Sequence, residues 1–325
     1  MTLVGKYLYS IIAGSVLFIG LISINTIFAK DNPIEAGRWV SELLSIKNEA
    51  VSKLNPDLVI VSGSNGLFGF SAERLTKTYK INSVNAAIHA GLGIDYTTFY
   101  AKRYFSPNRV IVLPLEYEQY TKSSAGGTFV YQALSHDSEY FNALSTFKKL
   151  KFIASIPLEM HFGFIRNLIM PSKSTSGRYD SKTINKYGDE TKNNWSYEEK
   201  EEQEKRLKNS LKLKAVKIYE HSEEAWNTLE EFVNDASHNG VTIILAHPNR
   251  FDQSIDISFN QYFFDELERR ANKIGLELLG DPKARFFGVS RIYDTNYHQN
   301  SKGQELSTDT LYRQLLEAGA LVNNE

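Results

Sequence analysis

The residues best suited to chemistry are a serine in a small-residue turn near the start of the chain and an acid–base pair near its end. Leu58 to Val61 is an apolar, mostly β-branched run that predicts a strand buried on both faces. The small residues from Ser62 to Gly66 follow as a tight turn, and a helix should open near Ser71. A tight turn between strand and helix exposes a serine hydroxyl beside backbone N–H groups that can hold an oxyanion. An ordinary βα loop is the alternative for this stretch taken alone.

An aspartate and a histidine stand close together in a polar segment near the C-terminus. Asp294 and His298 precede a helical pattern that runs from Gln304 to about Leu316. In such a pair the carboxylate fixes the imidazole tautomer, and the imidazole accepts the proton of a serine hydroxyl. A solvated loop is the alternative for an isolated pair of this kind. Together with a strand-end serine, the pair favours a Ser-His-Asp triad.

The order of these blocks resembles that of the SGNH (GDSL-like) hydrolase superfamily. That family places its nucleophilic serine after the first strand and its aspartate and histidine together near the C-terminus. Ser64, in the sequence Ser-Gly-Ser, matches the serine of the family's Gly-Asp-Ser block. Asp294 and His298 match the terminal D-x-x-H block, with one additional residue between them. The resemblance implies that Ser64 is the nucleophile, His298 the base and then the acid, and Asp294 the residue that orients the imidazole.

The blocks between these ends depart further from the family pattern. Val84 to Gly91 is similar to the second block, whose glycine donates an N–H to the oxyanion, and Ala90 or Gly91 stands at that position. The third block should hold an asparagine after the third strand, but none follows the run from Val110 to Pro114. The resemblance implies an oxyanion hole built from the Ser64 N–H and a donor near Gly91. The residues expected to form the oxyanion hole and the pocket are Gly91, Asn65, Glu116 and Tyr117.

Strands that alternate with helices predict an α/β fold with a mostly parallel sheet and with ligands at the carboxyl ends of its strands. An amphipathic helix from Ile34 to about Leu54 should precede the first strand. The resemblance, which covers about residues 55–320, implies a flavodoxin-like three-layer α/β/α arrangement with about five strands. The expected strands are Leu58–Val61, Ile81–Ile88, Val110–Leu113, Val241–Ala246 and Leu276–Leu279, and the expected helices between and after them include Asp95–Phe105, Ser222–Asn239 and Asn260–Ile274.

An uncharged apolar stretch from Leu8 to Ala29 is long enough for one membrane span. A cleaved signal peptide is the alternative, but it needs small residues before the cleavage point, and the bulky Ile27 stands there. We therefore predict an uncleaved signal-anchor, or transmembrane segment, over residues 1–30. The domain from residue 31 to 325 should lie outside the cytoplasm, an orientation that rests mainly on Lys6 and the amino terminus.

Residues 121 to about 215 interrupt the α/β rhythm and are expected to form a helical insertion in the domain. Phe147 to Met170 is rich in aromatic and aliphatic residues and has lysines at one end, so it could lie in the membrane interface or form a lid over the site. An ordinary amphipathic helical insertion is the alternative. Glu198 to Lys208 is a run of mixed charge that indicates a solvated helix face.

Composition excludes several kinds of site and partner. The chain of 325 residues has a formal net charge of -1, so no overall field favours binding to nucleic acid. It has no cysteine, which excludes disulfides, thiolate catalysis and cysteine-bound zinc. Its 7 histidines show no zinc-binding spacing, and the sequence has neither a Gly-rich dinucleotide motif nor a Walker A motif. We therefore expect neither a metal nor a cofactor.

Other polar residues follow the predicted strands without completing a motif. His247 and Arg250 come after the fourth strand, and we interpret them as ordinary loop polarity. His89 ends the second strand, and we interpret it as a local hydrogen-bonding residue rather than a second base. Ser62 to Gly66 also approximates the G-x-S-x-G elbow of α/β-hydrolases, but that fold places its acid well before its histidine.

The N-terminal anchor adds to the resemblance with exported SGNH-like proteins of bacterial cell-envelope and exopolysaccharide acylation. It implies an extracytoplasmic acyl esterase or O-acyltransferase, in particular an O-acetyltransferase, with an acylated carbohydrate or another acyl donor as substrate and a membrane-bound acyltransferase as partner. The alternative is a catalytically degenerate SGNH-fold binding or assembly module of a polysaccharide-modifying complex. The missing third-block asparagine and the longer spacing between Asp294 and His298 favour that alternative. Convergence of the three triad side chains would separate the two hypotheses.

Overall fold

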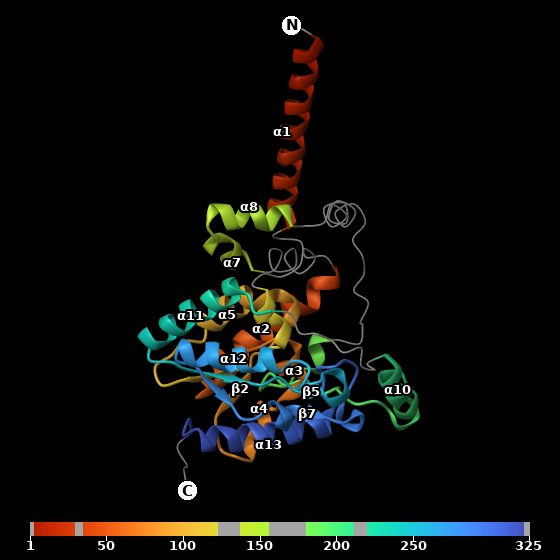
Figure 1. Cartoon of the computed structure of the whole chain (residues 1–325), viewed down its shortest axis with the longest axis vertical. Helices are drawn as coiled ribbons and strands as arrows, with labels where there is room; N and C mark the ends of the chain where they lie inside the picture. The colour runs from red at the N-terminus through yellow and green to blue at the C-terminus, as the bar shows by residue number, and fades with distance from the viewer. Residues whose placement is uncertain (1–2, 30–34, 123–136, 156–179, 211–219, 322–325) are drawn as a thin grey trace. The chain divides into compact units, whose positions relative to one another are not determined.

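The computed structural model describes residues 3–29, 35–122, 137–155, 180–210 and 220–321 (Figure 1). The chain divides into two compact units. The first unit consists of Met1–Ser41 and Ala125–Gly177, and the second of Glu42–Ser124 and Arg178–Glu325. The predicted insertion, residues 121 to about 215, is therefore divided between the two units.

The first unit contains an N-terminal helix, α1 (Leu3–Ala29), that is long and apolar enough to cross a membrane. Its most apolar window, Val4–Leu21, has a mean hydropathy of 1.6 and is not buried against other parts of the chain. Two short helices, α7 (Ser138–Ala143) and α8 (Thr146–Ala154), belong to the same unit. Helix α8 covers the start of the predicted Phe147–Met170 segment, and the rest of that segment after residue 155 lies outside the described residues.

The second unit is built on a five-stranded sheet in which all neighbouring strands are parallel, in the order β2-β1-β3-β4-β6. The prediction of an α/β fold with a parallel sheet of five strands is confirmed, although β2 is shorter than the expected strand from Ile81 to Ile88. Because the strands are parallel, the segments that follow them share one edge of the sheet. The strands are β1 (Leu58–Ile60), β2 (Ser83–Asn85), β3 (Val110–Leu113), β4 (Thr242–Ala246) and β6 (Glu277–Leu279).

A second, two-stranded parallel sheet pairs β5 (Arg250–Phe251) with β7 (Phe286–Phe287). It was not predicted, because two residues are too few to show the period of a strand. Its buried phenylalanines pack with Ile292 and with Leu207 of helix α10 (Tyr197–Ser210) in a small apolar cluster. This cluster fixes the segments that lead from β4 and β6 toward the C-terminal helix.

The chain after β1 forms two short helices, where we predicted a turn and one helix. Helix α3 (Ser64–Gly69) begins inside the expected turn, and α4 (Ala72–Lys77) follows it. Helix α4 begins next to Ser71, where a helix was predicted to open, and the Ser71 side chain caps it by accepting a hydrogen bond from the Arg74 N–H at 3.1 Å. The predicted turn is wrong because a carboxylate distant in the sequence, Glu116, satisfies an N–H at the start of α3.

The longer helices follow the predicted positions closely. The Ser222 side chain caps α11, and the Asn300 side chain caps α13 by accepting the Gly303 N–H at 3.1 Å, so that α13 starts before the expected Gln304. The mixed-charge run forms α10 as expected. These helices are α2 (Glu35–Leu54), α5 (Gly93–Lys102), α10 (Tyr197–Ser210), α11 (Glu223–His238), α12 (Gln261–Lys273) and α13 (Ser301–Glu317). Short 3₁₀ turns occupy Ala90–Leu92, Tyr117–Thr121, Ser181–Thr183, Asp252–Ser254, Pro282–Arg285 and Val289–Arg291.

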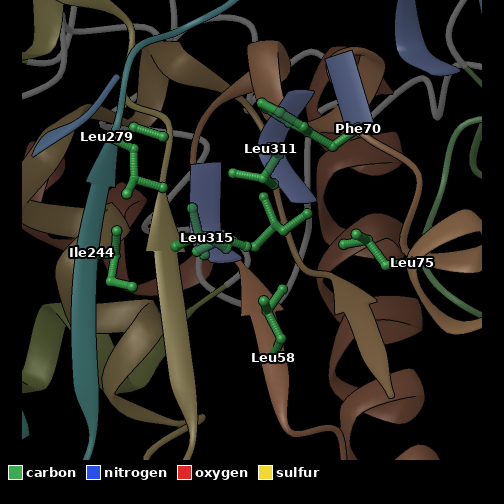
Figure 2. Close-up of a cluster of buried hydrophobic side chains, with 10 residues drawn as sticks. Leu58, Phe70, Leu75, Ile244, Leu279, Leu311 and Leu315 are labelled. Atoms are coloured by element: carbon green, nitrogen blue, oxygen red, sulfur yellow. The ribbon is translucent and has the colours of Figure 1, made fainter. Parts of the chain in front are cut away.

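One face of the sheet packs against α4 and α13 (Figure 2). Leu58 and Ile60 of β1 lie in the same cluster as Leu311 and Leu315 of α13, and all four are fully buried. Val59, which alternates with them along β1, is also fully buried, as expected for a strand covered on both faces. Burying one leucine side chain contributes roughly 1.5–3 kcal/mol, so this cluster holds the C-terminal helix on the sheet.

Candidate functional site

The predicted acid–base pair forms a buried hydrogen bond. The His298 Nδ1–H donates to Asp294 Oδ1 at 2.7 Å, and the two side chains are 7% and 2% exposed. The Tyr293 N–H donates to the His298 carbonyl at 2.8 Å, which closes the segment into a compact loop. The carboxylate therefore holds the imidazole with Nδ1 protonated, and Nε2 is the basic nitrogen.

The His298 ring lies against the helix that begins at Ser64. It stacks on Phe68 of α3, with ring centroids 4.2 Å apart and an angle of 18° between the planes. Phe68 comes about one helical turn after Ser64. The Asn65 side chain adds a second connection, because its Nδ2 donates to the Tyr297 carbonyl at 3.2 Å. Two side chains of α3 thus hold the histidine loop beside the helix that carries the serine.

Ser64 is half-buried and begins α3 just after the carboxyl end of β1. Its hydroxyl makes no hydrogen bond to His298 or to any other residue in the described part of the chain. The preceding Gly63 lies directly against the backbone of Ala90, where a Cβ atom would overlap with it. The structure therefore brings the serine turn, the Asp294–His298 pair and the turn at Ala90 to one region of the second unit. Catalytic hydrogen bonds are often long without substrate, so the missing hydrogen bond does not exclude a serine site.

The turn expected to donate to the oxyanion uses one of its N–H groups internally. The Gly91 N–H donates to His89 Nδ1 at 2.9 Å. Burial, with a smaller contribution from the charge of His298, lowers the pKa of His89 to about 4. The His89 ring is therefore neutral at pH 7, with its proton on Nε2. His89 has the local hydrogen-bonding role that we expected, and the Gly91 N–H is directed at its ring.

Glu116 is buried and binds the start of α3. Its Oε1 accepts the Asn65 N–H at 2.8 Å, and its Oε2 accepts an N–H of the Gln119 amide at 2.6 Å. Burial raises the pKa of Glu116 to about 7, although these hydrogen bonds act in the opposite direction. The Asn65 Nδ2 also donates to the Asn249 carbonyl at 2.7 Å. Asn65 is therefore a positioning residue, since both its N–H and its side-chain amide are used within the fold.

Tyr117 follows the third strand, is fully buried and packs against α12. Its hydroxyl lies 3.2 Å from His247 Nδ1, and its ring makes edge contacts with Phe263 and Phe264 at centroid distances of 5.7 and 5.2 Å. Burial, aided by the charge of Arg285, lowers the pKa of His247 to about 3, so the imidazole is neutral and accepts the Tyr117 hydroxyl. The two predicted residues after the third strand thus stabilise the packing around the site.

A cavity of about 320 Å³ opens at the carboxyl ends of β4 and β6. Its lining includes His247 after β4, Gly280 and Asp281 after β6, and the carboxylates of Asp265 and Glu268 on α12. None of the three triad residues lines it. Because all five strands are parallel, the cavity opens at the same edge of the sheet as the serine turn.

Arg250 and Glu118 enclose the side chain of Tyr297, the residue before His298. Arg250 donates to the Tyr297 hydroxyl and lies 4.6 Å from the centroid of its ring. The hydroxyl in turn donates to Glu118 Oε2 at 2.6 Å. The interpretation of Arg250 and His247 as loop polarity is wrong, because both side chains are buried and hydrogen-bonded. The cluster around Tyr297 fixes the backbone that carries the catalytic histidine candidate.

Sequence reasoning missed the contributions of Phe68, Asn249 and Tyr297 to the site. Phe68 follows Ser64 by one turn only if a helix begins at Ser64, and we expected a turn there. Asn65 was predicted as a pocket residue, whereas its observed partners are the backbone carbonyls of Asn249 and Tyr297. Recognising α3 would have placed Phe68 near the serine, but no local signal identifies the two asparagine contacts.

Within the described residues, no group of three or more histidine, aspartate or glutamate side chains could hold a metal ion. No protein-family model matches the sequence, and no curated protein matches it. The function is therefore inferred from the residues and geometry of the site itself.

Proposed function

We propose that the protein is a membrane-anchored, extracytoplasmic serine acyl esterase or O-acyltransferase that acts on sugars of the cell envelope or of exopolysaccharide. One observation carries this proposal. The buried Asp294–His298 pair is held by Phe68 and Asn65 against the helix that Ser64 begins. These are the three groups that a Ser-His-Asp mechanism needs, and the mechanism needs no cofactor.

In the proposed reaction, Ser64 Oγ attacks the acyl carbonyl carbon while His298 Nε2 takes the hydroxyl proton. Asp294 stabilises the imidazolium that forms. The imidazolium then gives its proton to the leaving alkoxide, and the acyl group remains on Ser64. Water or a sugar hydroxyl next gives a proton to His298 and attacks the acyl carbon. The bond to Ser64 Oγ then breaks, and His298 returns the proton to that oxygen. Exclusion of water from the site would favour transfer, in particular of acetyl groups, over hydrolysis.

The oxyanion of each step would be stabilised by the Ser64 N–H and by the turn at Gly91. Gly63 packs directly on Ala90, so this turn stands beside the serine. In the free protein the Gly91 N–H donates to His89. The proposal requires that the Gly91 N–H leave the His89 ring and donate to the oxyanion when substrate binds, since two donors stabilise an oxyanion better than one.

The proposed fold is the flavodoxin-like three-layer arrangement. The order β2-β1-β3-β4-β6 supports it, because numbering these five strands along the chain gives the flavodoxin-like order 2-1-3-4-5. Helix α1 would be the single-pass anchor, with the residues after it outside the cytoplasm and a membrane-bound acyltransferase as the source of acyl groups. A reporter fused to the C-terminus should therefore be active outside the cytoplasm, and cytoplasmic activity would reject this orientation.

The test of the chemistry uses the full chain in detergent, a fluorophosphonate probe and p-nitrophenyl acetate. Ser64 should carry the phosphonyl group, and acetate should be released; Ser64→Ala should abolish both. Ser237→Ala, at an exposed position on α11, is the matched control and should retain both. Labelling and turnover that persist in Ser64→Ala would reject the triad.

A binding or assembly module is the second candidate, and one observation favours it. The N–H groups of Gly91 and Asn65, two residues expected at the oxyanion hole, both donate within the protein. Such a module would bind an acetylated oligosaccharide without releasing acetate. Equal binding by the wild type and Ser64→Ala, with no turnover of either acyl donor, would identify it.

A further inference from the structure

Helix α8 has one packed side and one apolar side that faces solvent. On the packed side, the Phe152 ring contacts Tyr140 and Phe141 of α7, each with ring centroids 6.0 Å apart. On the other side, Phe147 and Leu150 are 77% and 62% exposed. These two residues are three positions apart, so they lie on one face of the helix.

The apolar side of α8 is accompanied by positive charge. The helix sequence TFKKLKFIA contains three lysines and no acidic residue, in a chain whose net charge is -1. Lys149 folds back onto α7, where its Nζ donates to the Asn142 carbonyl at 3.0 Å. Lys148 and Lys151 remain exposed. An apolar stripe with lysines beside it is the pattern of a helix that lies on an anionic lipid surface.

The position of α8 in the chain favours a membrane, rather than another protein, as the partner of its apolar side. Helix α8 belongs to the same compact unit as α1, the helix that is long and apolar enough to cross a membrane. Nearly all the large exposed apolar residues of the described chain belong to α1 or α8, and the few others are Phe259, Tyr262 and Leu306. At about 1.5 Å per residue, α8 is roughly 14 Å long and cannot cross a hydrocarbon core of about 30 Å.

We infer that α8 is an interfacial membrane helix, which inserts Phe147 and Leu150 among the acyl chains and places Lys148 and Lys151 at anionic phospholipid head groups. The inference rests on the proposed insertion of α1 and goes beyond it. A second contact would fix the first unit against the membrane plane, whereas a single spanning helix leaves the chain free to rotate about its axis.

The test exploits the absence of cysteine, because one introduced thiol is the single labelling site in the full chain. Phe147→Cys and Leu150→Cys carry an environment-sensitive fluorophore in proteoliposomes of phosphatidylcholine with or without phosphatidylglycerol. Leu17→Cys in α1 reports on the anchor, and Tyr262→Cys in α12 is the control for an exposed ring outside the proposed contact. Doxyl-labelled lipids at shallow and deep positions measure contact with the acyl chains.

The probes at 147 and 150 should shift to the blue and be quenched by shallow doxyl lipids when phosphatidylglycerol is present, whereas the probe at 262 should not. Replacing Lys148 and Lys151 with glutamine should reduce the fraction of molecules in which α8 lies on the lipid. The equilibrium constant for this contact should fall by about fivefold for each lysine. Quenching at 17 together with water-like emission at 147 and 150 would overturn the inference and leave the anchor standing. Water-like emission at 17 would reject the anchor instead. A blue shift at 147 without doxyl quenching would show a protein contact and also overturn the inference.

Discussion

The second unit buries the pair Asp294 and His298 and, in another region, Lys47 and Asp189, and only the first pair looks like a site for chemistry. At the carboxyl edge of the sheet, Asp294 holds His298 beside α3. Near the edge strand β2, burial lowers the pKa of Lys47 to about 7 and raises the pKa of the neighbouring Asp189. Burial and a perturbed pKa are thus not enough to distinguish a catalytic group from a structural one.

The difference lies in what each pair binds. Lys47 donates to the carbonyls of Asn85 and Gly188. The carboxylate of Asp189 accepts from the start of α4, with the Ala72 N–H at 2.7 Å. The Asn85 N–H donates to the Tyr187 carbonyl at 2.9 Å, so it is not available to a substrate either. This region is closed by its own backbone and fixes the segment around residue 188 on the edge of the sheet. The other pair lies against α3, which begins at Ser64, and the Ser64 hydroxyl has no hydrogen-bond partner among the described residues.

The largest effect should be a loss of turnover that follows substitutions in the Ser64–His298 region and not in the Lys47–Asp189 region. Ser64→Ala removes the attacking oxygen and His298→Ala removes its base, and each change should reduce turnover of p-nitrophenyl acetate by about three orders of magnitude or more. The double variant should be little worse, since the two groups act as one unit. The thermal melt of Ser64→Ala should be nearly unchanged, whereas His298→Ala should melt at a lower temperature, because it removes the imidazole that binds the buried Asp294 and stacks on Phe68. Losses that multiply in the double variant would contradict a shared mechanism.

The next effect should appear in stability. Asp189→Asn removes the charge that binds the N–H groups at the start of α4 and that favours the protonated form of the buried Lys47. Loss of a hydrogen bond to a charged group typically costs about 1.5–3 kcal/mol in the free energy of unfolding. Activity per folded molecule should stay at the wild-type level. Lys47→Met added to Asp189→Asn should recover part of the loss. The control Asp235→Asn breaks only an exposed ion pair with Lys102 and should leave denaturant midpoints unchanged.

A pH dependence should come from Glu116, which is buried like Lys47 but binds α3. Its pKa is raised from 4.5 to about 7, so the folded state holds more protons than the unfolded state between these values. The resulting stabilisation is fully present below pH 4.5 and is lost as pH rises through 7, a change of up to about 3 kcal/mol. Glu116→Gln should remove this slope from denaturant titrations. The same slope in Glu116→Gln as in the wild type would assign it to other groups, and Glu231→Gln, at an exposed position, is the control.

The smallest effect should come from a residue that acts through His298 without touching substrate. Asn65→Ala removes the amide that binds the Tyr297 carbonyl, so the imidazole should lie less accurately beside Ser64. Misplacement of this kind costs about 10- to 100-fold in kcat, with little change in KM. An unchanged kcat with normal folding would show that Phe68, Asp294 and the contacts of Tyr297 position the ring without Asn65.

The positions of the strands could be predicted from the sequence, because each strand contains a short run of β-branched and other apolar residues. Val110–Leu113 was placed at its observed bounds, and Val241–Ala246 differs by one residue. The edge strand β2 was overestimated because the apolar pattern continues past Asn85, where the ladder ends. Apolar patterning reports burial, which extends beyond the hydrogen-bonded part of a strand.

The candidate site was predictable in its residue types and not in its connections. Ser64, Asp294 and His298 were found from block order, because each block has a local pattern. The bonds that assemble them join residues far apart in the sequence, such as Asn65 with Glu116 and Asn65 with Tyr297. Such contacts depend on how the elements pack, and neither propensity nor periodicity encodes them. The helix at Ser64 was missed for the same reason, since a distant carboxylate stabilises its start.

The hydrogen bond from Asn65 to Tyr297 also means that the site can form only after nearly the whole chain has been synthesised. It joins positions that are 232 residues apart, so the serine is synthesised long before its base. A chain is made from its N-terminus, and contacts between distant segments form late because a long loop must close first. Until α13 docks on the sheet, the serine has no imidazole beside it. Under the proposed function, a chain still in transit across a membrane would therefore carry the proposed nucleophile without its base, and ester chemistry would begin only after folding is complete.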